Sequence, residues 1–254
     1  MNHVKWLQRC SLGWVLLFCM LSPVRADTIL VAAAASLSNA FKDLASRYEH
    51  AHPDTRVLTS FAASDVVLRQ ILEGAPADLF ASADQAAMDQ AQKAGVIDAA
   101  TRRDFARNQL VLIVPADDPL GIQTLADLRR PDIRRIALGN PGSVPVGRYT
   151  QAALQHAGLA EVLESRQILG QNVRQVLSYV ERGEVDAGFV FATDAAIAAD
   201  KVKVVQTLDS PVPVIYPVAL VARANRSAKA ADFLDYILSA PGQATLARYH
   251  FAQP

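Results

Sequence analysis

The chain has 254 residues, with 25 Lys and Arg against 25 Asp and Glu, and a mean hydropathy of +0.15. This neutral balance lacks the basic patch that binding to a nucleic-acid backbone normally requires, so we expect no nucleic-acid partner. After the N-terminal segment, no stretch stays apolar for the roughly 20 residues needed to span a bilayer. The length allows one large domain or two smaller lobes, each with its own core.

Residues 1–26 have the composition of a secretory signal peptide. Lys5 and Arg9 give a positive start, an almost uninterrupted apolar run covers residues 11–21, and small residues that a signal peptidase accepts lead to Ala26. The sequence therefore predicts export to the periplasm, with cleavage after Ala26.

Two features of the segment disfavour the alternatives to a cleaved signal peptide. An uncleaved membrane anchor is disfavoured because the apolar run is too short to span a bilayer. A lipoprotein attached through Cys19 is disfavoured because the bulky Phe18 directly precedes the cysteine.

Cleavage changes the composition of the exported chain. The segment holds three Lys and Arg residues and no Asp or Glu, which leaves 22 Lys and Arg against 25 Asp and Glu, a net charge of −3. Both cysteines and both tryptophans also lie in the segment. The mature chain therefore has no disulfide, no cysteine nucleophile and no thiolate for a metal.

From residue 27 onward, short β-rich runs alternate with helical patterns, which is typical of an α/β fold with a largely parallel sheet. The first run, residues 28–33, shows no polar alternation, as expected for a strand covered on both faces. Apolar residues from Leu37 to Tyr48 then follow the 3.6-residue period of a helix. Further strands are predicted over residues 56–61, 77–81, 109–114, 135–138, 185–191, 202–206 and 214–223. Further helices are predicted over residues 66–73, 85–93, 124–130, 146–156, 172–182, 227–238 and 242–249.

The 228 residues after Ala26 could form one doubly wound sheet or two α/β lobes. We favour two lobes, because the boundary between them creates a cleft of the kind in which ligands bind. The predicted organisation is a signal peptide over residues 1–26, a first lobe over residues 27–108 and 216–254, and a second lobe over residues 109–215.

Enzyme signatures are scarce in this sequence. It contains no G-x-G-x-x-G, G-x-x-x-x-G-K-[ST], H-E-x-x-H or G-x-S-x-G motif. His50 and His52 have a loose metal-ligand spacing, but their place at a helix end favours solvated surface histidines. We therefore expect a protein that is not an enzyme and carries no cofactor.

Four predicted helix starts follow strands through turns of small, hydroxyl-bearing or glycine residues, at Ser36, Ser64, Val146 and Val173. A helix start offers unpaired backbone N–H groups and the positive end of the helix dipole, which suits an anion. Each turn taken alone could be an ordinary capped helix. If all four converge across a cleft, they form a cage of neutral hydrogen-bond donors.

Such a cage suits a fully deprotonated tetrahedral oxyanion, which offers only acceptors. A protonated phosphate would instead need at least one acceptor from the protein. This reasoning does not separate sulfate from a larger oxyanion, because pocket size decides between them.

Several blocks of the sequence closely resemble the periplasmic molybdate-binding proteins of ABC transporters, and the resemblance covers nearly all of residues 28–251. The blocks are residues 33–37 (AAASL), 60–62 (SFA), 69–71 (RQI), 74–84 (GAPADLFASAD), 139–147, 173–174, 180–182 and 216–218. The resemblance implies a two-lobed class II periplasmic binding fold with the ligand in the interlobe cleft. It also implies a monomer that binds molybdate or tungstate with high affinity and delivers it to a membrane permease and its ATPase subunit.

The resemblance also implies a set of ligand contacts. Ser36 and Ser64 would each give a hydroxyl and a backbone N–H, while Val146 and Val173 would give backbone N–H groups only. Molybdenum would be held only as its oxyanion. Phe191 occupies the position of a family tyrosine whose hydroxyl often reaches the oxyanion, so this contact is missing here.

Two other functions stay open at this point. A receptor for sulfate or another tetrahedral oxyanion would use the same donors, although the family blocks argue against it. A secreted hydrolase could use Ser36 or Ser64 as nucleophile, but it would need a histidine base, and no mature histidine follows a predicted strand.

Overall fold

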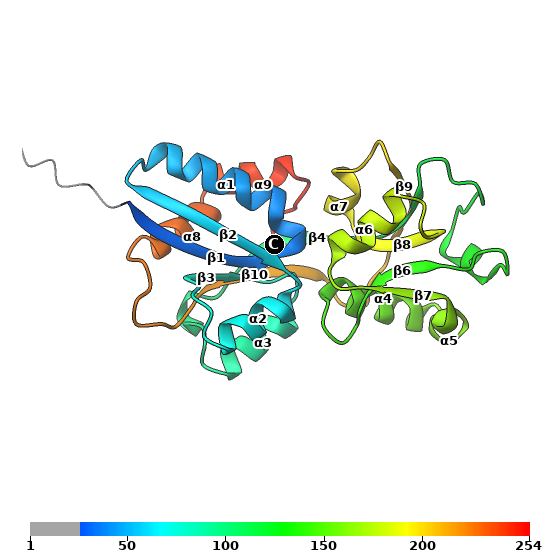
Figure 1. The fold of residues 1–254 in the computed structure, drawn as a ribbon, viewed down its shortest axis with the longest axis horizontal. Coiled ribbons are helices and arrows are strands. Elements are labelled where there is room, and N and C mark those ends of the chain that lie inside the picture. Colours follow the sequence, from blue (N-terminus) through cyan, green and yellow to red (C-terminus); the bar gives the residue numbers. More distant parts are fainter. Residues whose placement is uncertain (1–25) are drawn as a thin grey trace, which may run out of the picture.

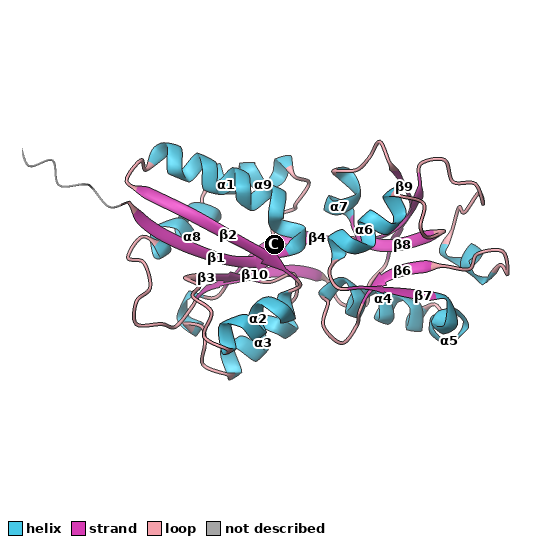
Figure 2. Cartoon of the chain, in the orientation of Figure 1, coloured by secondary structure: helices cyan, strands magenta, loops and turns pink. Residues whose placement is uncertain are grey.

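The computed structural model describes residues 26–254, so the predicted signal peptide, apart from its last residue, lies outside the described residues. The described chain forms two α/β lobes, each built around a five-stranded sheet with helices packed against it (Figure 1, Figure 2). Within residues 26–254, no helix has both the length and the apolar character to cross a membrane.

The first lobe contains the sheet with strand order β2-β1-β3-β10-β4. Its strands are β1 (Asp27–Ala34), β2 (Thr55–Ala62), β3 (Leu79–Ala81), β4 (Arg103–Asn108) and β10 (Val214–Leu220). Its helices are α1 (Ser38–Ala51), α2 (Ser64–Leu72), α3 (Gln85–Lys93), α8 (Ala230–Leu238) and α9 (Ala240–Arg248).

The second lobe contains the sheet with strand order β7-β6-β8-β5-β9. Its strands are β5 (Leu110–Pro115), β6 (Ile136–Gly139), β7 (Gln167–Gly170), β8 (Ala187–Phe191) and β9 (Val202–Leu208). Its helices are α4 (Pro145–His156), α5 (Ala160–Leu163), α6 (Val173–Glu181) and α7 (Ala192–Ala196).

The prediction of largely parallel sheets is wrong for half of each sheet. β1 runs parallel to β2 and β3, and β6 runs parallel to β7 and β8, as expected. In contrast, β10 runs antiparallel to β3 and β4, and β5 runs antiparallel to β8 and β9. The chain passes between the lobes through the segments β4–β5 and β9–β10, and these crossing segments make the antiparallel pairs.

Most predicted elements are present, but four were missed and one differs in type. β4, β7, α5 and α7 were not predicted, and the predicted helix over residues 124–130 is a 3₁₀ turn (Leu125–Arg129). Half of the residues of β4 carry a charge, and only its Phe105 and Ala106 are buried. β7 lies at a sheet edge with Ile168 and Leu169 exposed, so neither strand carries the buried apolar run that marks a strand in a sequence.

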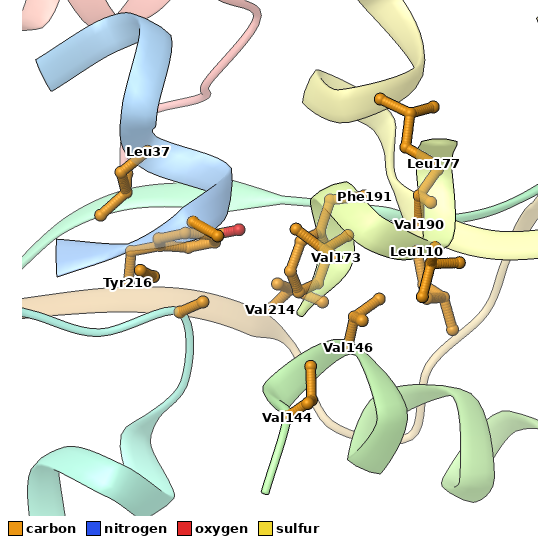
Figure 3. Packing of buried hydrophobic residues seen from close by; sticks show 14 of the residues in the cluster. Leu37, Leu110, Val144, Val146, Val173, Leu177, Val190, Phe191, Val214 and Tyr216 are labelled. Carbon is orange, nitrogen blue, oxygen red and sulfur yellow. The ribbon is translucent and has the colours of Figure 1, made fainter. Parts of the chain in front are cut away.

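The core continues from one lobe into the other. One cluster of buried side chains includes Leu37 and Tyr216 of the first lobe together with Val146, Val173 and Phe191 of the second (Figure 3). The facing surfaces of the two lobes are therefore packed against each other, which places the helix starts of both lobes at one boundary.

Candidate functional site

All five site residues predicted from the sequence line one small cavity between the lobes. Its empty volume is about 210 Å³, a figure that includes space open to solvent, so the enclosed space is smaller still. The cavity therefore suits a small ion. Its lining consists of Ala34, Ala35, Ser36, Ala63, Ser64 and Ala83 from the first lobe and Val144, Pro145, Val146, Asn172, Val173 and Phe191 from the second.

Ser36 lies after β1, at the edge of the first sheet that faces the cavity. It was predicted to open a helix, but it occupies the 3₁₀ turn Ala35–Leu37 that precedes α1. The side chain is buried, and its Oγ accepts a hydrogen bond from the Tyr216 hydroxyl at 3.0 Å. Because this oxygen already accepts a hydrogen bond, the Ser36 proton is available for an acceptor in the cavity.

Ser64 is the first residue of α2. The sequence predicted a helix start at this residue, and the N-cap position belongs to Ala63, whose backbone is extended. The Ser64 Oγ instead accepts a hydrogen bond from the backbone N–H of Ala83 at 2.9 Å. Ser64 is fully buried, and its own proton is likewise available to donate.

The second lobe presents two helix starts to the cavity. Val146 follows Pro145 at the start of α4, and Val173 is the first residue of α6. The first N–H groups of a helix have no intrahelical acceptor and carry the positive end of its dipole. These two positions therefore offer backbone donors whatever their side chains are.

Gly147 lets the start of α4 pack tightly against the end of β6. A Cβ atom at Gly147 would lie 2.1 Å from the carbonyl oxygen of Gly139, which no real contact allows. The absence of a side chain here brings the helix start down onto the sheet edge. The same packing positions Val146 at the cavity.

Phe191 is the last residue of β8 and is buried. Its ring packs edge-on against Tyr149, with centroids 6.1 Å apart, and against Tyr216, with centroids 5.8 Å apart. Figure 3 shows the Tyr216 hydroxyl pointing to the side on which Val173 and Phe191 lie. Phe191 thus gives the cavity an apolar wall without a hydrogen bond.

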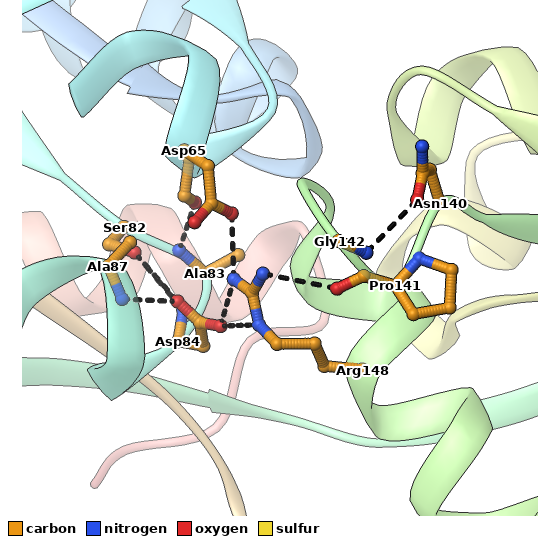
Figure 4. Close-up of polar contacts among 10 residues, drawn as sticks. Asp65, Ser82, Ala83, Asp84, Ala87, Asn140, Pro141, Gly142 and Arg148 are labelled. Carbon is orange, nitrogen blue, oxygen red and sulfur yellow. Dashed lines mark hydrogen bonds and ion pairs between the residues drawn. The ribbon is translucent and has the colours of Figure 1, made fainter. Parts of the chain in front are cut away.

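Arg148 of α4 reaches across the lobe boundary to two carboxylates of the first lobe (Figure 4). Its Nη2 lies 2.8 Å from Asp65 Oδ2 and 2.5 Å from Asp84 Oδ2. Asp65 directly follows Ser64, so Arg148 neutralises the carboxylate closest in sequence to a cavity serine. These ion pairs also link the two lobes in this closed arrangement.

Arg174 of α6 makes the second link between the lobes. Its Nη2 donates to the backbone carbonyl of Ser36 at 3.2 Å, and its Nη1 donates to Asn39 Oδ1 at 2.8 Å. Its Nε lies 2.6 Å from the buried Asp194, whose pKa burial raises to about 6 while Arg174 opposes the rise. At neutral pH this carboxylate is ionised and holds the guanidinium in place.

The two arginines form a pattern that the sequence did not reveal. Arg174 directly follows Val173, and Arg148 lies two residues after Val146. Each arginine contacts the first lobe at or next to a cavity serine. Asn108 and Tyr216, which support Ser36, were also missed as site residues. Arg174 and Tyr216 lie in the family blocks, but no local pattern shows what any of the four contacts, because each acts through a partner far away in the sequence.

The cavity has a simple chemical character. None of the four described histidines lines it. Within residues 26–254, no group of three or more His, Cys, Asp or Glu side chains is placed to hold a metal ion. The lining offers hydroxyls, helix-start N–H groups and apolar surface.

The sequence matches the family of bacterial extracellular solute-binding proteins over residues 29–252. The chain belongs to this family. The molybdate-binding protein ModA of Escherichia coli K12 is 38% identical to this solute-binding protein over 97% of this chain and 98% of its own length. ModA of Haemophilus influenzae is 33% identical over 88% of this chain and 89% of its own.

Solved structures share the fold of this solute-binding protein. The periplasmic molybdate-binding protein of Azotobacter vinelandii matches with a TM-score of 0.77 at 24% identity, over 89% of this chain and 99% of that chain. The sulfate-binding protein SubI of Mycobacterium tuberculosis H37Rv matches with a TM-score of 0.78 at 18% identity, over 89% of this chain and 87% of that chain. The predicted two-lobed periplasmic binding fold and the family resemblance are confirmed.

Proposed function

We propose that this protein binds molybdate, and by the same chemistry tungstate, in the periplasm. The observation that carries the proposal is the single cavity that Ser36, Ser64, Val146 and Val173 line together. A fully deprotonated oxyanion offers only acceptors, and this lining offers hydroxyl and N–H donors to meet them. The relatives named as molybdate-binding proteins support molybdate as the oxyanion.

The proposed cycle involves no covalent chemistry. The open lobes would admit the dianion, and closure would remove its water and replace it with fixed donors from both lobes. We propose that the closed protein is a monomer that delivers its cargo to the membrane permease and ATPase of an ABC transporter. Residues 27–108 with 216–254 and residues 109–215 would then move as the two lobes. Export would follow cleavage of residues 1–26.

Sulfate is the alternative ligand, because it is also a tetrahedral dianion and SubI shares the fold. Calorimetric titration of the mature protein with molybdate, alone and in the presence of excess sulfate, separates the two. We expect tight binding of molybdate and little change when sulfate is added. Equal binding of the two anions would contradict the proposed specificity.

Arg148 gives a prediction about closure. Arg148→Met removes both ion pairs between the lobes and leaves Asp65 and Asp84 unpaired near the bound dianion. The Arg148 side chain is 27% exposed, so we discount the pairing for solvent and expect molybdate affinity to fall by about 5- to 30-fold. Calorimetry at low and high salt measures the change, which should shrink at high salt.

Arg47→Met is the matched control for Arg148→Met. Arg47 pairs with Asp43 at 2.8 Å within the first lobe, so its loss breaks an ion pair without touching the lobe boundary. The Arg47→Met variant should bind molybdate with the affinity of the wild-type protein. If both variants weaken binding equally, Arg148 does not act by linking the lobes.

A further inference from the structure

Asn108 and Tyr216 make polar contacts beside the cavity that the proposed ligand contacts do not explain. Asn108 ends β4, where the chain crosses between the lobes, and Tyr216 lies on the neighbouring strand β10, two residues after Val214, the residue opposite Asn108. The Tyr216 side chain is completely buried, and its ring packs edge-on against Phe105 and Phe251. A phenylalanine would pack these rings equally well, so the buried hydroxyl calls for a separate explanation.

The contacts of Asn108 fix which end of its amide faces Tyr216. Its Oδ1 accepts from the backbone N–H groups of Gln109 at 2.9 Å and Thr193 at 3.4 Å. The opposite end is therefore the NH₂ group, which donates to Thr193 Oγ1 at 2.8 Å and to the Tyr216 hydroxyl oxygen at 3.2 Å. Tyr216 accordingly accepts a hydrogen bond from Asn108.

The direction of the next hydrogen bond follows from this one. The pKa of Tyr216 is raised well above its ordinary value, first by burial and then by the charge of Asp194, so the hydroxyl keeps its proton. Its oxygen already accepts from Asn108, and its one proton is donated to Ser36 Oγ at 3.0 Å. Ser36 is thus the acceptor in this pair, and its own proton points elsewhere.

We propose that Asn108 and Tyr216 are positioning residues that hold the Ser36 hydroxyl as a hydrogen-bond donor toward the cavity. This inference rests on the proposed function. It deepens that function, because a Ser36 hydroxyl whose proton is free for the cavity favours a fully deprotonated oxyanion. An oxyanion that still carries a proton, such as hydrogen phosphate, needs an acceptor, and the Ser36 lone pair that Tyr216 occupies is closed to it.

A double-mutant cycle tests whether Tyr216 acts through Ser36. Tyr216→Phe keeps the ring and removes the hydroxyl, and we expect it to weaken molybdate binding by about fivefold, the effect of one ordinary hydrogen bond. In the Ser36→Ala variant, adding Tyr216→Phe should change the molybdate Kd by less than about twofold, because the hydroxyl that Tyr216 orients is already absent. Calorimetric Kd values for the four proteins complete the cycle.

Hydrogen phosphate provides a second readout that a purely structural role would not change. With Tyr216→Phe, the Ser36 hydroxyl can rotate and accept, so the ratio of hydrogen phosphate Kd to molybdate Kd should fall by about tenfold. Tyr149→Phe is the matched control, since this tyrosine is also buried and its ring, like that of Tyr216, packs edge-on against Phe191. The control should leave the ratio unchanged, and thermal unfolding should confirm that every variant is folded.

The outcomes distinguish this inference from the proposed function. If the wild-type protein does not bind molybdate, the proposed function is wrong and the inference is overturned with it. If the wild-type protein binds molybdate but Tyr216→Phe has the same effect with and without the Ser36 hydroxyl, the inference alone is overturned. An unchanged phosphate-to-molybdate ratio in Tyr216→Phe overturns it as well.

Discussion

Replacing Ser36 and Ser64 together by alanine is expected to weaken molybdate binding by about 10²- to 10⁴-fold. Each hydroxyl would donate one hydrogen bond to a charged ligand, and such a bond contributes about 1.5–3 kcal/mol. Both serines line the cavity, and the oxygen of each already accepts a hydrogen bond from the protein. The removed protons therefore have no substitute in the variant, and the loss should be visible in a calorimetric titration.

Ser60→Ala is the control for the double variant. Ser60 lies on β2 with its side chain exposed, four residues before Ser64, so the same chemical change is made outside the cavity. Its molybdate affinity should match the wild-type value, and both proteins should show cooperative thermal unfolding. Wild-type affinity in the folded double variant would contradict the cage of donors.

Val173→Pro is expected to weaken molybdate binding by about 10- to 150-fold, the effect of losing one hydrogen bond from a backbone N–H to an anion. Val173 is the first residue of α6, where proline is well tolerated and the N–H has no intrahelical acceptor. The preceding Asn172 has φ −163° and ψ 169°, an extended conformation compatible with a following proline. The substitution therefore removes a donor while the helix is retained.

Val173→Ala separates the backbone donor from the side chain. Alanine keeps the N–H and shortens the side chain, so its molybdate affinity should stay within about threefold of wild type if the side chain only adds apolar contact. Far-ultraviolet circular dichroism of both variants checks that α6 is intact. Equal losses for proline and alanine would show that the valine side chain, not its N–H, contributes to binding.

The cavity explains how an acidic chain could bind a dianion. The described residues place no lysine in the cavity lining, and the carboxylates of Asp65 and Asp84 beside it are paired with Arg148. The starts of α2, α4 and α6 line the same small volume, and helix starts carry positive potential. The overall charge of −3 expected for the mature chain therefore does not decide the charge of its ligand.

The sequence predicted the features that depend on local patterns. The apolar run of β1 and the helical period of α1 are signals within one segment, as are the small-residue turns that carry Ser36 and Ser64. The strand directions of β5 and β10 could not be predicted this way, because they depend on how the chain crosses between lobes. The exposed edge strand β7 lacked the buried run that marks a strand.

The residues that support the cavity serines could not be predicted from local sequence patterns either. Arg148 and Asp65 are 83 positions apart, and Tyr216 and Ser36 are 180 positions apart. Neither pair has a spacing that a sequence window could detect. The sequence thus indicated residues that line the cavity, while the residues that hold them in place emerged only from the three-dimensional contacts.

A crystal structure of the mature protein with molybdate, with the metal located by its anomalous scattering, tests the central claim most directly. We expect one molybdenum peak in the cavity between the lobes. Its oxygens should lie about 2.7–3.1 Å from the Ser36 and Ser64 hydroxyls and from the backbone nitrogens of Val146 and Val173. A peak outside this cavity, or one coordinated directly by carboxylate or histidine side chains, would contradict the account.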